Sequence, residues 1–313
     1  MEPKPLEIYW KEWTYIKDRL LDRGQVYRRF DSSQYLRTGT IEEINAEVGF
    51  VRNLRQRGFP VPEVLGQGEI NGLGYYTERS VGKVSLGEHF QSEYVSQGKV
   101  SDTTFTAYCE MTCKFLAAQL DPANRINGES DLRKGIHLAN VLEENPDIDA
   151  DQIERYVTKI EDKLQIPPLT LTHGDLSPFN MFEEGIIDFE HKFIAPVGYD
   201  VLTSATDQRF WNYTGVDGKT QLEYDLSAGQ IAYYLDRIDA VAKQHGVEGF
   251  LKFTDEFVLL KAIWSLAHEK EFASQSGNIL KWDFRKAVLI YCMEQYLHNE
   301  PIDTNKFKEL NRQ

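Results

Sequence analysis

Hydrophobic positions divide the chain into a first part with short alternating runs and a second part with helical spacing. Between residues 25 and 80, four short runs of β character are separated by turns, and a stretch with apolar positions three to four residues apart interrupts them. Residues 6–21, which precede these runs, also have apolar positions spaced as in a helix. The pattern therefore predicts a small antiparallel sheet with one helix inserted into it.

The four β runs are predicted at residues 25–30, 34–38, 63–69 and 74–80. Asp31-Ser32-Ser33 lies between the first two runs, which indicates a hairpin. The inserted helix is predicted over residues 40–57. It ends at Gly58, because Pro60 and Pro62 prevent it from continuing.

Beyond Gly82 the spacing becomes helical. Helices are predicted at residues 103–120, 151–164, 222–245, 254–273 and 283–298, and a β-rich segment with apolar runs 169–172 and 185–189 lies among them. The change at Gly82 predicts two lobes, residues 1–82 with a hinge at about 77–82, and residues 83–313.

Charge is distributed unevenly between these two parts. The net charge is −14, which argues against a nucleic-acid partner. The first 83 residues carry 13 Lys/Arg and 12 Asp/Glu of totals of 35 and 49, so the excess of acid lies in the second part. Two explanations are open: this charge is solvated surface, or part of it attracts a cationic substrate.

Composition sets further limits. No stretch approaches eighteen uninterrupted apolar residues, so no membrane span is expected, and the first residues contain prolines and charges where a signal peptide would be apolar. The cysteines Cys109, Cys113 and Cys292 are too few for a disulfide framework. We expect them to be small buried side chains in a cytoplasmic protein. The sequence does not define the oligomeric state.

Three oxygen-bearing side chains lie within fourteen residues of the β-rich segment. Asp175 and Asn180 are five positions apart, and Asp188 follows the apolar run of the predicted hairpin. Phosphoryl transfer requires a carboxylate that orients the attacking hydroxyl and oxygen ligands that hold Mg²⁺ against the phosphates. The segment therefore predicts a phosphoryl-transfer site.

This segment resembles the catalytic motif of the aminoglycoside phosphotransferase and choline kinase families, H-G-D-x-x-x-x-N followed by I-D-F/W-E, here His173 to Asn180 and Ile187 to Glu190. The resemblance implies an α+β, bilobal, protein-kinase-like fold with a small antiparallel-sheet lobe and a mostly helical lobe. It also implies that Asp175 is the catalytic base, that Asn180 and Asp188 bind Mg²⁺, and that His173 braces the loop.

The same resemblance assigns nucleotide-binding residues in the first lobe. Arg37 would face the phosphates of ATP or GTP, and Glu47 would hold Arg37. Thr77 and Arg79 would lie in the hinge, whose backbone meets the base. The phosphate loop at residues 22–25 has only one glycine, Gly24, and the strand before it is expected to be short or missing.

The implied function is Mg²⁺-dependent transfer of the γ-phosphate of ATP or GTP to a hydroxyl of a small molecule, such as an aminoglycoside, choline, ethanolamine, a sugar or an amino alcohol. The long docking segment of protein kinases is missing after Asp188. Asp200 is expected to cap a helix N-terminus. Acceptor contacts are sought among polar and aromatic residues of the second lobe: Asp207, Trp211, Tyr213, Glu269 and Glu271. The alternatives are a catalytically weak nucleotide-binding scaffold and an atypical protein kinase.

Overall fold

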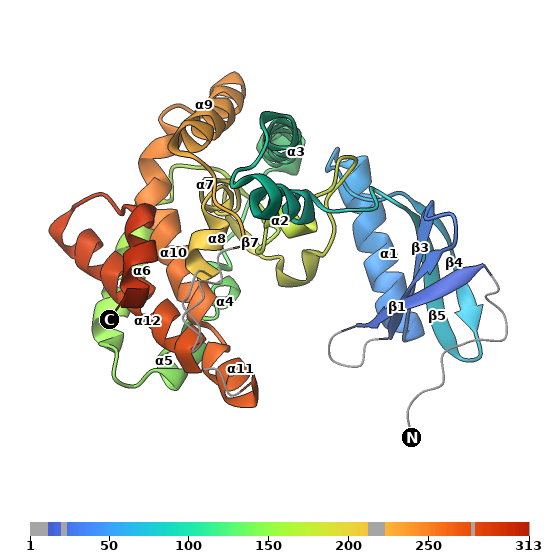
Figure 1. The fold of residues 1–313 in the computed structure, drawn as a ribbon, viewed down its shortest axis with the longest axis horizontal. Helices are drawn as coiled ribbons and strands as arrows, with labels where there is room; N and C mark the ends of the chain where they lie inside the picture. The colour runs from blue at the N-terminus through green and yellow to red at the C-terminus, as the bar shows by residue number, and fades with distance from the viewer. Residues whose placement is uncertain (1–11, 20–23, 212–222, 277–278, 313) are drawn as a thin grey trace. The chain divides into compact units, whose positions relative to one another are not determined.

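The computed structural model describes residues 12–19, 24–211, 223–276 and 279–312. The chain divides into two compact units (Figure 1): residues 1–85 with 181–187 form the first, and residues 86–180 with 188–313 form the second. The chain therefore passes from one unit to the other three times, at residues 85–86, 180–181 and 187–188.

The first unit is a five-stranded antiparallel sheet with the order β1-β2-β3-β5-β4. Helix α1 lies along one face of the sheet (Figure 1), and its Ile44 and Val48 pack on Tyr76 to form a buried cluster. A capping box between Thr40 and Glu43 begins the helix. The elements are β1 (Trp13–Asp18), β2 (Gln25–Arg29), β3 (Gln34–Gly39), α1 (Ile41–Gln56), β4 (Val64–Ile70) and β5 (Leu73–Arg79).

The predicted hairpin, inserted helix and later strand pair of this unit are confirmed. The helix predicted over residues 6–21 is wrong where the structure describes it, because Trp13–Asp18 form strand β1. The expectation of a short or missing first strand is also wrong. Strand β1 is an edge strand with mostly exposed side chains, so its sequence lacks the alternation of hydrophobic and polar residues that identifies a half-buried strand. The ring of Tyr15 in β1 contacts the ring of Tyr27 in β2 edge-on, with 5.9 Å between the ring centres. Ile8 and Leu20 lie outside the described residues.

The second unit is mostly helical, with α10 packed against α5, α7, α11 and α12. A two-stranded sheet of β6 and β7 brackets the segment with the candidate catalytic residues. Its helices and strands are α2 (Leu86–Gln97), α3 (Asp102–Leu120), α4 (Leu132–Gly135), α5 (Leu138–Glu144), α6 (Ala150–Lys163), β6 (Leu169–Leu171), β7 (Ile194–Pro196), α7 (Val201–Ser204), α8 (Asp207–Trp211), α9 (Ala228–Gln244), α10 (Thr254–Leu266), α11 (Glu269–Ser276) and α12 (Ile279–His298). Short 3-10 helices include Pro178–Asn180 and Phe189–His191.

Several predictions for this unit need correction. The helix predicted over residues 254–273 is two helices, because His268 adopts a left-handed conformation with φ +60° between α10 and α11. The apolar run 185–189 does not form a strand: only Ile186 takes part in a bridge, to Met181. The apolar run 169–172 contains β6, which pairs with β7. Helix α2 was not predicted, and α9 begins at Ala228 instead of residue 222.

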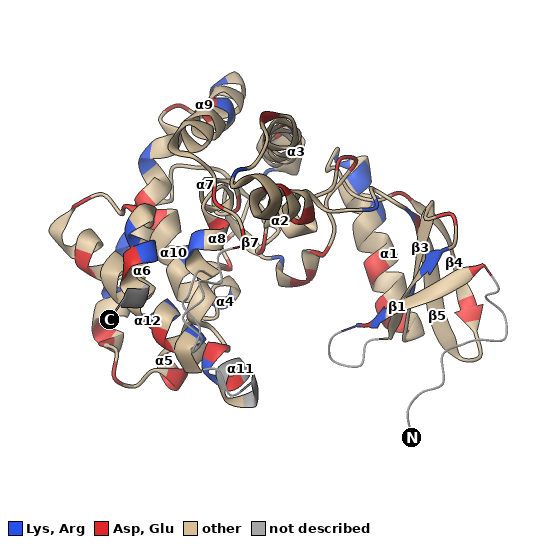
Figure 2. Cartoon of the chain, in the orientation of Figure 1, with Lys and Arg blue, Asp and Glu red and all other residues tan. Residues whose placement is uncertain are grey.

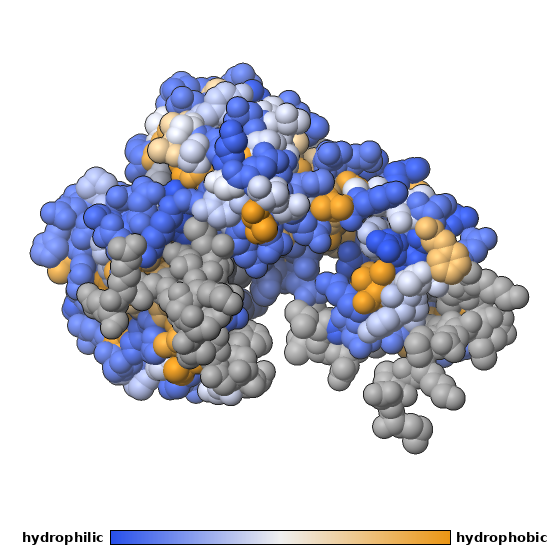
Figure 3. Space-filling view, in the orientation of Figure 1, coloured by the Kyte–Doolittle hydropathy of each residue, from blue (hydrophilic) through white to orange (hydrophobic). Residues whose placement is uncertain are grey.

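Charged and hydrophobic residues of the described part of the chain are dispersed in the views shown. Acidic residues are spread over many helices of the second unit (Figure 2), which favours solvated surface for most of that charge. On the face shown in Figure 3, hydrophobic residues are scattered among hydrophilic ones. The three cysteines are buried and free, as predicted. Within the described part of the chain, no helix has the length and apolar character needed to cross a bilayer. The α+β class, a small antiparallel sheet followed by a helical region, is confirmed.

Gly24 and Gly49 provide a matched test of the sheet unit. Gly24 has φ +116°, and a Cβ there would lie 2.1 Å from the carbonyl oxygen of Thr38 in β3. Gly24→Ala should therefore lower the free energy of unfolding by about 2–3 kcal/mol. Gly49→Ala, on α1 with nothing within 4 Å, should raise it by about 0.5–1 kcal/mol. Urea unfolding of both variants checks this, and equal effects would contradict the close approach.

Candidate active site

The residues of the predicted catalytic loop lie between β6 and β7. The two strands pair from Leu169–Pro196 to Leu171–Ile194, so the segment between them begins and ends at one end of a short ladder. The backbone of Thr172 extends this closure by donating to the carbonyl of Phe193 at 2.8 Å. The loop is therefore anchored at both ends by backbone hydrogen bonds.

Asp200 holds the start of this loop. Its side chain accepts hydrogen bonds from the backbone N–H of His173 (3.0 Å) and of Gly174 (2.9 Å), and from the Nε2 of Gln119 (3.0 Å). Asp200 is 3% exposed, and burial raises the pKa of its carboxyl, while His173 and these hydrogen bonds act in the opposite direction. The expectation that Asp200 caps helix α7 is wrong, because its side chain makes no capping hydrogen bond and its oxygens are used by the loop.

The residues before Asp175 have little freedom. Gly174 has φ +85°, and a Cβ there would lie 2.0 Å from the carbonyl oxygen of His191, so only glycine fits. His173 is fully buried against the ring of Phe189, and its Nδ1 accepts the backbone N–H of Asp175 at 3.3 Å. The histidine thus braces the backbone of the candidate base.

Asp175 and Asn180 are brought together. The Nδ2 of Asn180 donates to the backbone carbonyl of Asp175 at 2.9 Å and approaches its Oδ2 at 3.4 Å. Ser177 stabilises a tight turn between Asp175 and Asn180, because its hydroxyl accepts a hydrogen bond from the N–H of Phe179 and its carbonyl accepts one from the N–H of Asn180. The amide nitrogen of Asn180 therefore faces the loop, and no hydrogen bond to its Oδ1 is found within the described part of the chain.

Asp188 has an unusual backbone for a residue with a side chain. Its φ and ψ are +69° and +57°, in the left-handed region, and it precedes the 3-10 helix Phe189–His191 without capping it. This conformation costs about 1–2 kcal/mol in a residue other than glycine. A bridge between Met181 and Ile186 closes the hairpin that connects Asn180 to Asp188. Met181, directly after Asn180, therefore lies beside Ile186, two residues before Asp188.

The donor atoms at these positions fit a magnesium ion. Asn180 offers an amide oxygen and Asp188 an exposed carboxylate, and Mg²⁺ is usually held by one or two such ligands together with water and substrate phosphates. Among the described residues there is no cluster of three or more His, Cys, Asp or Glu side chains suited to a metal. A site of this composition would have to be completed by phosphate oxygens.

A pocket of about 400 Å³ opens beside Asp175 in the second unit. Asp207 and Trp211, two of the expected acceptor contacts, are in its wall, whereas Tyr213 lies outside the described residues. Burial raises the pKa of Asp207 to about 6, and Asp175 adds to this, although Lys261 opposes it. Among the described residues, the lining is Asp175, Ser177, Phe179, Asp207, Gln208, Trp211, Glu223, Lys281 and Arg285.

Glu269 and Glu271 are not part of that lining. Glu269 is 4% exposed and forms an ion pair with Arg285. Glu271 is exposed on α11.

The first unit holds Arg37, on β3, against Glu78, on β5. The Nε of Arg37 lies 3.0 Å from Oε1 of Glu78, and both side chains are largely buried. Burial acts to lower the pKa of Arg37, but the Glu78 carboxylate, with Tyr76 and Glu47, raises it well above the ordinary value. No hydrogen bond from its terminal nitrogens is found among the described residues, so this planar fork is able to bind phosphate oxygens.

Glu47 does not hold Arg37 as expected. Its Oε2 pairs with Arg19 at 2.7 Å, and its Oε1 accepts the hydroxyl of Tyr76 at 2.9 Å. Arg19 follows β1, the strand that the sequence pattern missed, so this partner could not be foreseen. Glu78 on β5 is the carboxylate that pairs with Arg37 on the neighbouring strand β3, and Glu47 pairs with Arg19 instead.

Thr77 and Arg79 lie at the end of β5. Thr77 pairs with Leu36 on one side and Gly66 on the other, so its backbone groups face the neighbouring strands. The Arg79 side chain is exposed and forms an ion pair with Glu63 at 2.9 Å. Contacts of Thr77 and Arg79 with a nucleotide base stay a prediction.

Comparisons with known proteins agree with this geometry. The sequence model of the phosphotransferase enzyme family matches residues 23–240, more than half of the chain. The chain belongs to the phosphotransferase enzyme family. The prediction that it is a phosphotransferase enzyme is thereby confirmed. No curated protein matches its sequence.

Solved structures share the fold of this phosphotransferase at low identity. A choline/ethanolamine kinase family protein from Mesorhizobium loti matches with a TM-score of 0.54 and 15% identity over 99% of this chain and 96% of that one. A putative aminoglycoside phosphotransferase from Ralstonia eutropha gives 0.53 and 12% over 96% and 92%. An aminoglycoside phosphotransferase in a ternary complex with AMP-PNP and hygromycin B gives 0.53 and 14% over 91% and 94%. The predicted kinase-like fold and family resemblance are confirmed.

Sequence reasoning missed the closest charged neighbour of Asp175 in the phosphotransferase. Lys261 of α10 is 3% exposed, and its Nζ lies 3.5 Å from Asp175 Oδ1 and 3.6 Å from Asp207 Oδ1. A signal was present, because Lys261 is the one charge within the apolar run Phe257–Leu266. A charged residue inside such a run is buried only with partners.

Asp200→Asn tests whether the buried carboxylate orders the catalytic loop of the phosphotransferase. The variant replaces an acceptor of three hydrogen bonds by an amide whose nitrogen cannot accept, so the free energy of unfolding should fall by about 2–4 kcal/mol. Hydrogen exchange of the His173 and Gly174 amides should accelerate more than that of α3. As a control, Asp121→Asn changes an exposed acceptor for the N–H of Ala123 and should have a much smaller effect. Unchanged exchange at both loop amides would contradict the assigned role.

Proposed function

We propose that this phosphotransferase transfers the γ-phosphate of ATP or GTP to a hydroxyl group of a small molecule in a Mg²⁺-dependent reaction. The observation that carries the proposal is the Asp175 carboxylate, which is held by a rigid loop at the wall of a pocket large enough for a small acceptor. Family membership supports the phosphoryl transfer, and the pocket supports a small acceptor rather than a protein.

Asp175 would accept the proton of the acceptor hydroxyl as its oxygen attacks the γ-phosphorus and the bond to the β–γ bridging oxygen breaks. The nucleoside diphosphate is then the leaving group. The side chain of Asp175 is 27% exposed, so its carboxylate reaches the pocket while its backbone is held by His173. A base held in this way needs no reorientation during the reaction.

Asn180 and Asp188 would hold Mg²⁺, which when bound neutralises phosphate charge in this type of reaction. Arg37 would bind phosphate oxygens through its two terminal nitrogens, oriented by Glu78 at its Nε. Glu47, paired with Arg19 and Tyr76, would act on the nucleotide side only through the packing of α1. Thr77 and Arg79 stay candidates for the base-binding edge.

The pocket also indicates which acceptors fit. Quaternary ammonium groups are recognised by open aromatic faces. Here the tryptophan of the wall, Trp211, already carries a protein cation, since the Arg285 guanidinium carbon lies 4.1 Å from its ring centre. Glu223 remains in the wall as a carboxylate, and burial raises its pKa. We therefore propose an acceptor that offers N–H and O–H donors, such as an amino sugar or a primary amino alcohol.

Structural relatives support this acceptor class. One was solved with ADP and streptomycin and another with AMP-PNP and hygromycin B.

Transfer of labelled γ-phosphate from ATP or GTP to a panel of hydroxyl compounds tests the function. Asp175→Asn should lower kcat by about 10²–10⁴-fold, because the base is lost while its volume is kept. Asp188→Ala should abolish the Mg²⁺-dependent turnover, and EDTA should stop the wild-type reaction. Asp236→Asn, on the exposed side of α9, should leave turnover unchanged. Transfer that survives Asp175→Asn at the wild-type rate would refute the assignment.

Ethanolamine and choline form a matched pair of acceptors that differ only in their N-methyl groups. Because Arg285 lies over the ring of Trp211 and the pocket wall offers carboxylates, ethanolamine should be used with a kcat/KM at least about tenfold higher, a difference of about 1.4 kcal/mol. Steady-state kinetics with each compound checks this. Equal or better use of choline would show that an aromatic face is open in solution.

A further inference from the structure

Lys261 is a positive charge buried in an apolar helix. It lies in α10 between Leu260 and Ala262, which are both fully buried, and is itself 3% exposed. Taking an ammonium group out of water is costly unless opposite charges surround it. The side chain therefore needs partners, and their identity indicates its role.

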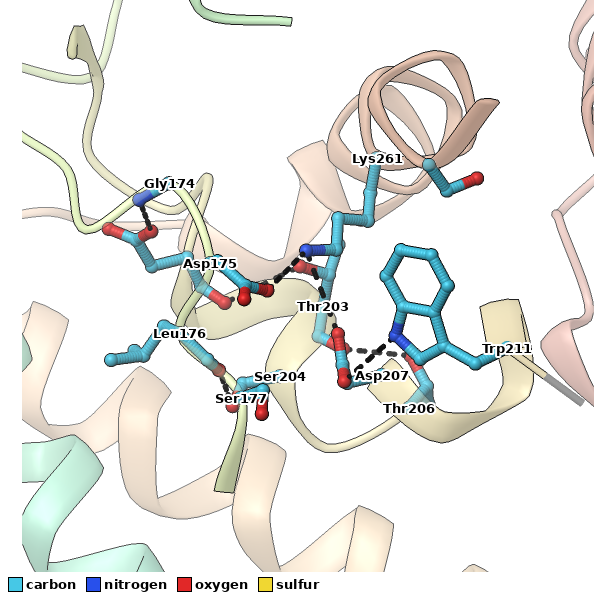
Figure 4. A network of polar contacts seen from close by, with 12 residues as sticks. Gly174, Asp175, Leu176, Ser177, Thr203, Ser204, Thr206, Asp207, Trp211 and Lys261 are labelled. Atoms are coloured by element: carbon cyan, nitrogen blue, oxygen red, sulfur yellow. Dashed lines mark hydrogen bonds and ion pairs between the residues drawn. The ribbon is translucent and has the colours of Figure 1, made fainter. Parts of the chain in front are cut away.

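Its partners are the carboxylates of Asp175 and Asp207 (Figure 4) and the indole ring of Trp264. The Nζ lies 3.5 Å from Asp175 Oδ1, 3.6 Å from Asp207 Oδ1 and 3.7 Å from the ring centre of Trp264. Asp207 is fixed in turn, since its Oδ2 accepts the indole N–H of Trp211 at 3.1 Å. The cation thus connects a buried, fixed carboxylate with the proposed base.

Each oxygen of the Asp175 carboxylate then has its own neighbour. Oδ1 faces the ammonium of Lys261, and Oδ2 lies 3.4 Å from the Nδ2 of Asn180. Two neighbours on different oxygens restrict rotation about the bond between Cβ and the carboxylate carbon. The orientation of the carboxylate is therefore set from two elements, α10 and the catalytic loop.

Stability alone does not account for this arrangement. One carboxylate, Asp207, would suffice to pair a buried ammonium, and replacement of buried ion pairs by apolar side chains is often neutral or stabilising. Asp175 is 27% exposed and faces the pocket, whereas Asp207 is 3% exposed. Both carboxylates line the pocket, and the second partner of Lys261 is the more exposed of the two, the one proposed to act as the base.

We propose that Lys261 is a positioning residue, anchored by Asp207, that holds the Asp175 carboxylate in its working orientation. The proposal rests on the proposed function for its catalytic consequence. The contact on which it depends can be measured whether or not the function is correct.

Two variants separate positioning from structural support. In Lys261→Met, Asp207 is left buried without its cation, so the unfolding temperature should fall. In Lys261→Met with Asp207→Asn, both charges are removed, and the unfolding temperature should recover. If Lys261 positions Asp175, kcat should stay about 10–100-fold below wild type in both variants while the KM for the nucleotide is unchanged.

Lys270→Met is the matched control. Lys270 also lies over a tryptophan, with its Nζ 5.3 Å from the ring centre of Trp282, but it donates to the carbonyl of Glu144 instead of to Asp175. Its kcat should equal that of wild type. Recovery of kcat together with stability in the double variant would overturn the proposal and leave Lys261 a structural residue.

A double-mutant cycle of Lys261→Met and Asp175→Asn gives a readout without turnover. Unfolding by urea of the wild type, both single variants and the double variant should show that the two changes are not additive. Additive changes would overturn the proposal even if transfer is observed. Non-additive changes in a protein that transfers phosphate to no acceptor would refute the proposed function and preserve the contact.

Discussion

The hydrogen bonds that Asp200 accepts from the backbone of His173 and Gly174 are the constraint on which the acceptor side of this phosphotransferase depends. They are made by a carboxylate with almost no exposure to water, where an unpaired N–H group would be expensive. With this end of the loop fixed, the backbone conformation of Gly174 determines where Asp175 begins. Everything further along the loop, including the approach of Asn180 to Asp175, is built on that fixed point.

Charge is handled differently in the two units. In the sheet unit two largely buried arginines each pair with one carboxylate: Arg19 with Glu47, and Arg37 with Glu78. In the helical unit a single ammonium, that of Lys261, serves two carboxylates. The first pattern leaves the terminal nitrogens of Arg37 available for an anion. The second places carboxylate oxygens at the pocket wall, which suits an acceptor with hydrogen-bond donors.

The sequence predicted the parts of the fold and site that depend on local pattern. The helix 40–57 and the hairpin 25–38 have strong periodicity and turn residues, and the spacing of Asp175 and Asn180 reflects one tight loop. Features that depend on contacts distant in sequence were missed. Strand β1 has no buried face to give it a pattern, and the partners of Glu47 and Asp200 lie 28 and 26–27 residues away along the chain. No spacing rule connects such residues, because only the folded chain determines which of several carboxylates lies nearest.

The positions of Asn180 and Asp188 depend on how the chain passes between the two units. The segment between them, residues 181–187, belongs to the sheet unit, while both residues belong to the helical unit. The backbone of Ile186 donates to the carbonyl of Pro60, and that of Glu184 donates to the carbonyl of Val81, so the hairpin is held by the sheet unit at its tip. Each proposed metal ligand therefore lies at the residue where the chain passes between units. The left-handed backbone of Asp188 lies at one of these passages. This conformation costs about 1–2 kcal/mol, which one or two hydrogen bonds of the hairpin are enough to offset.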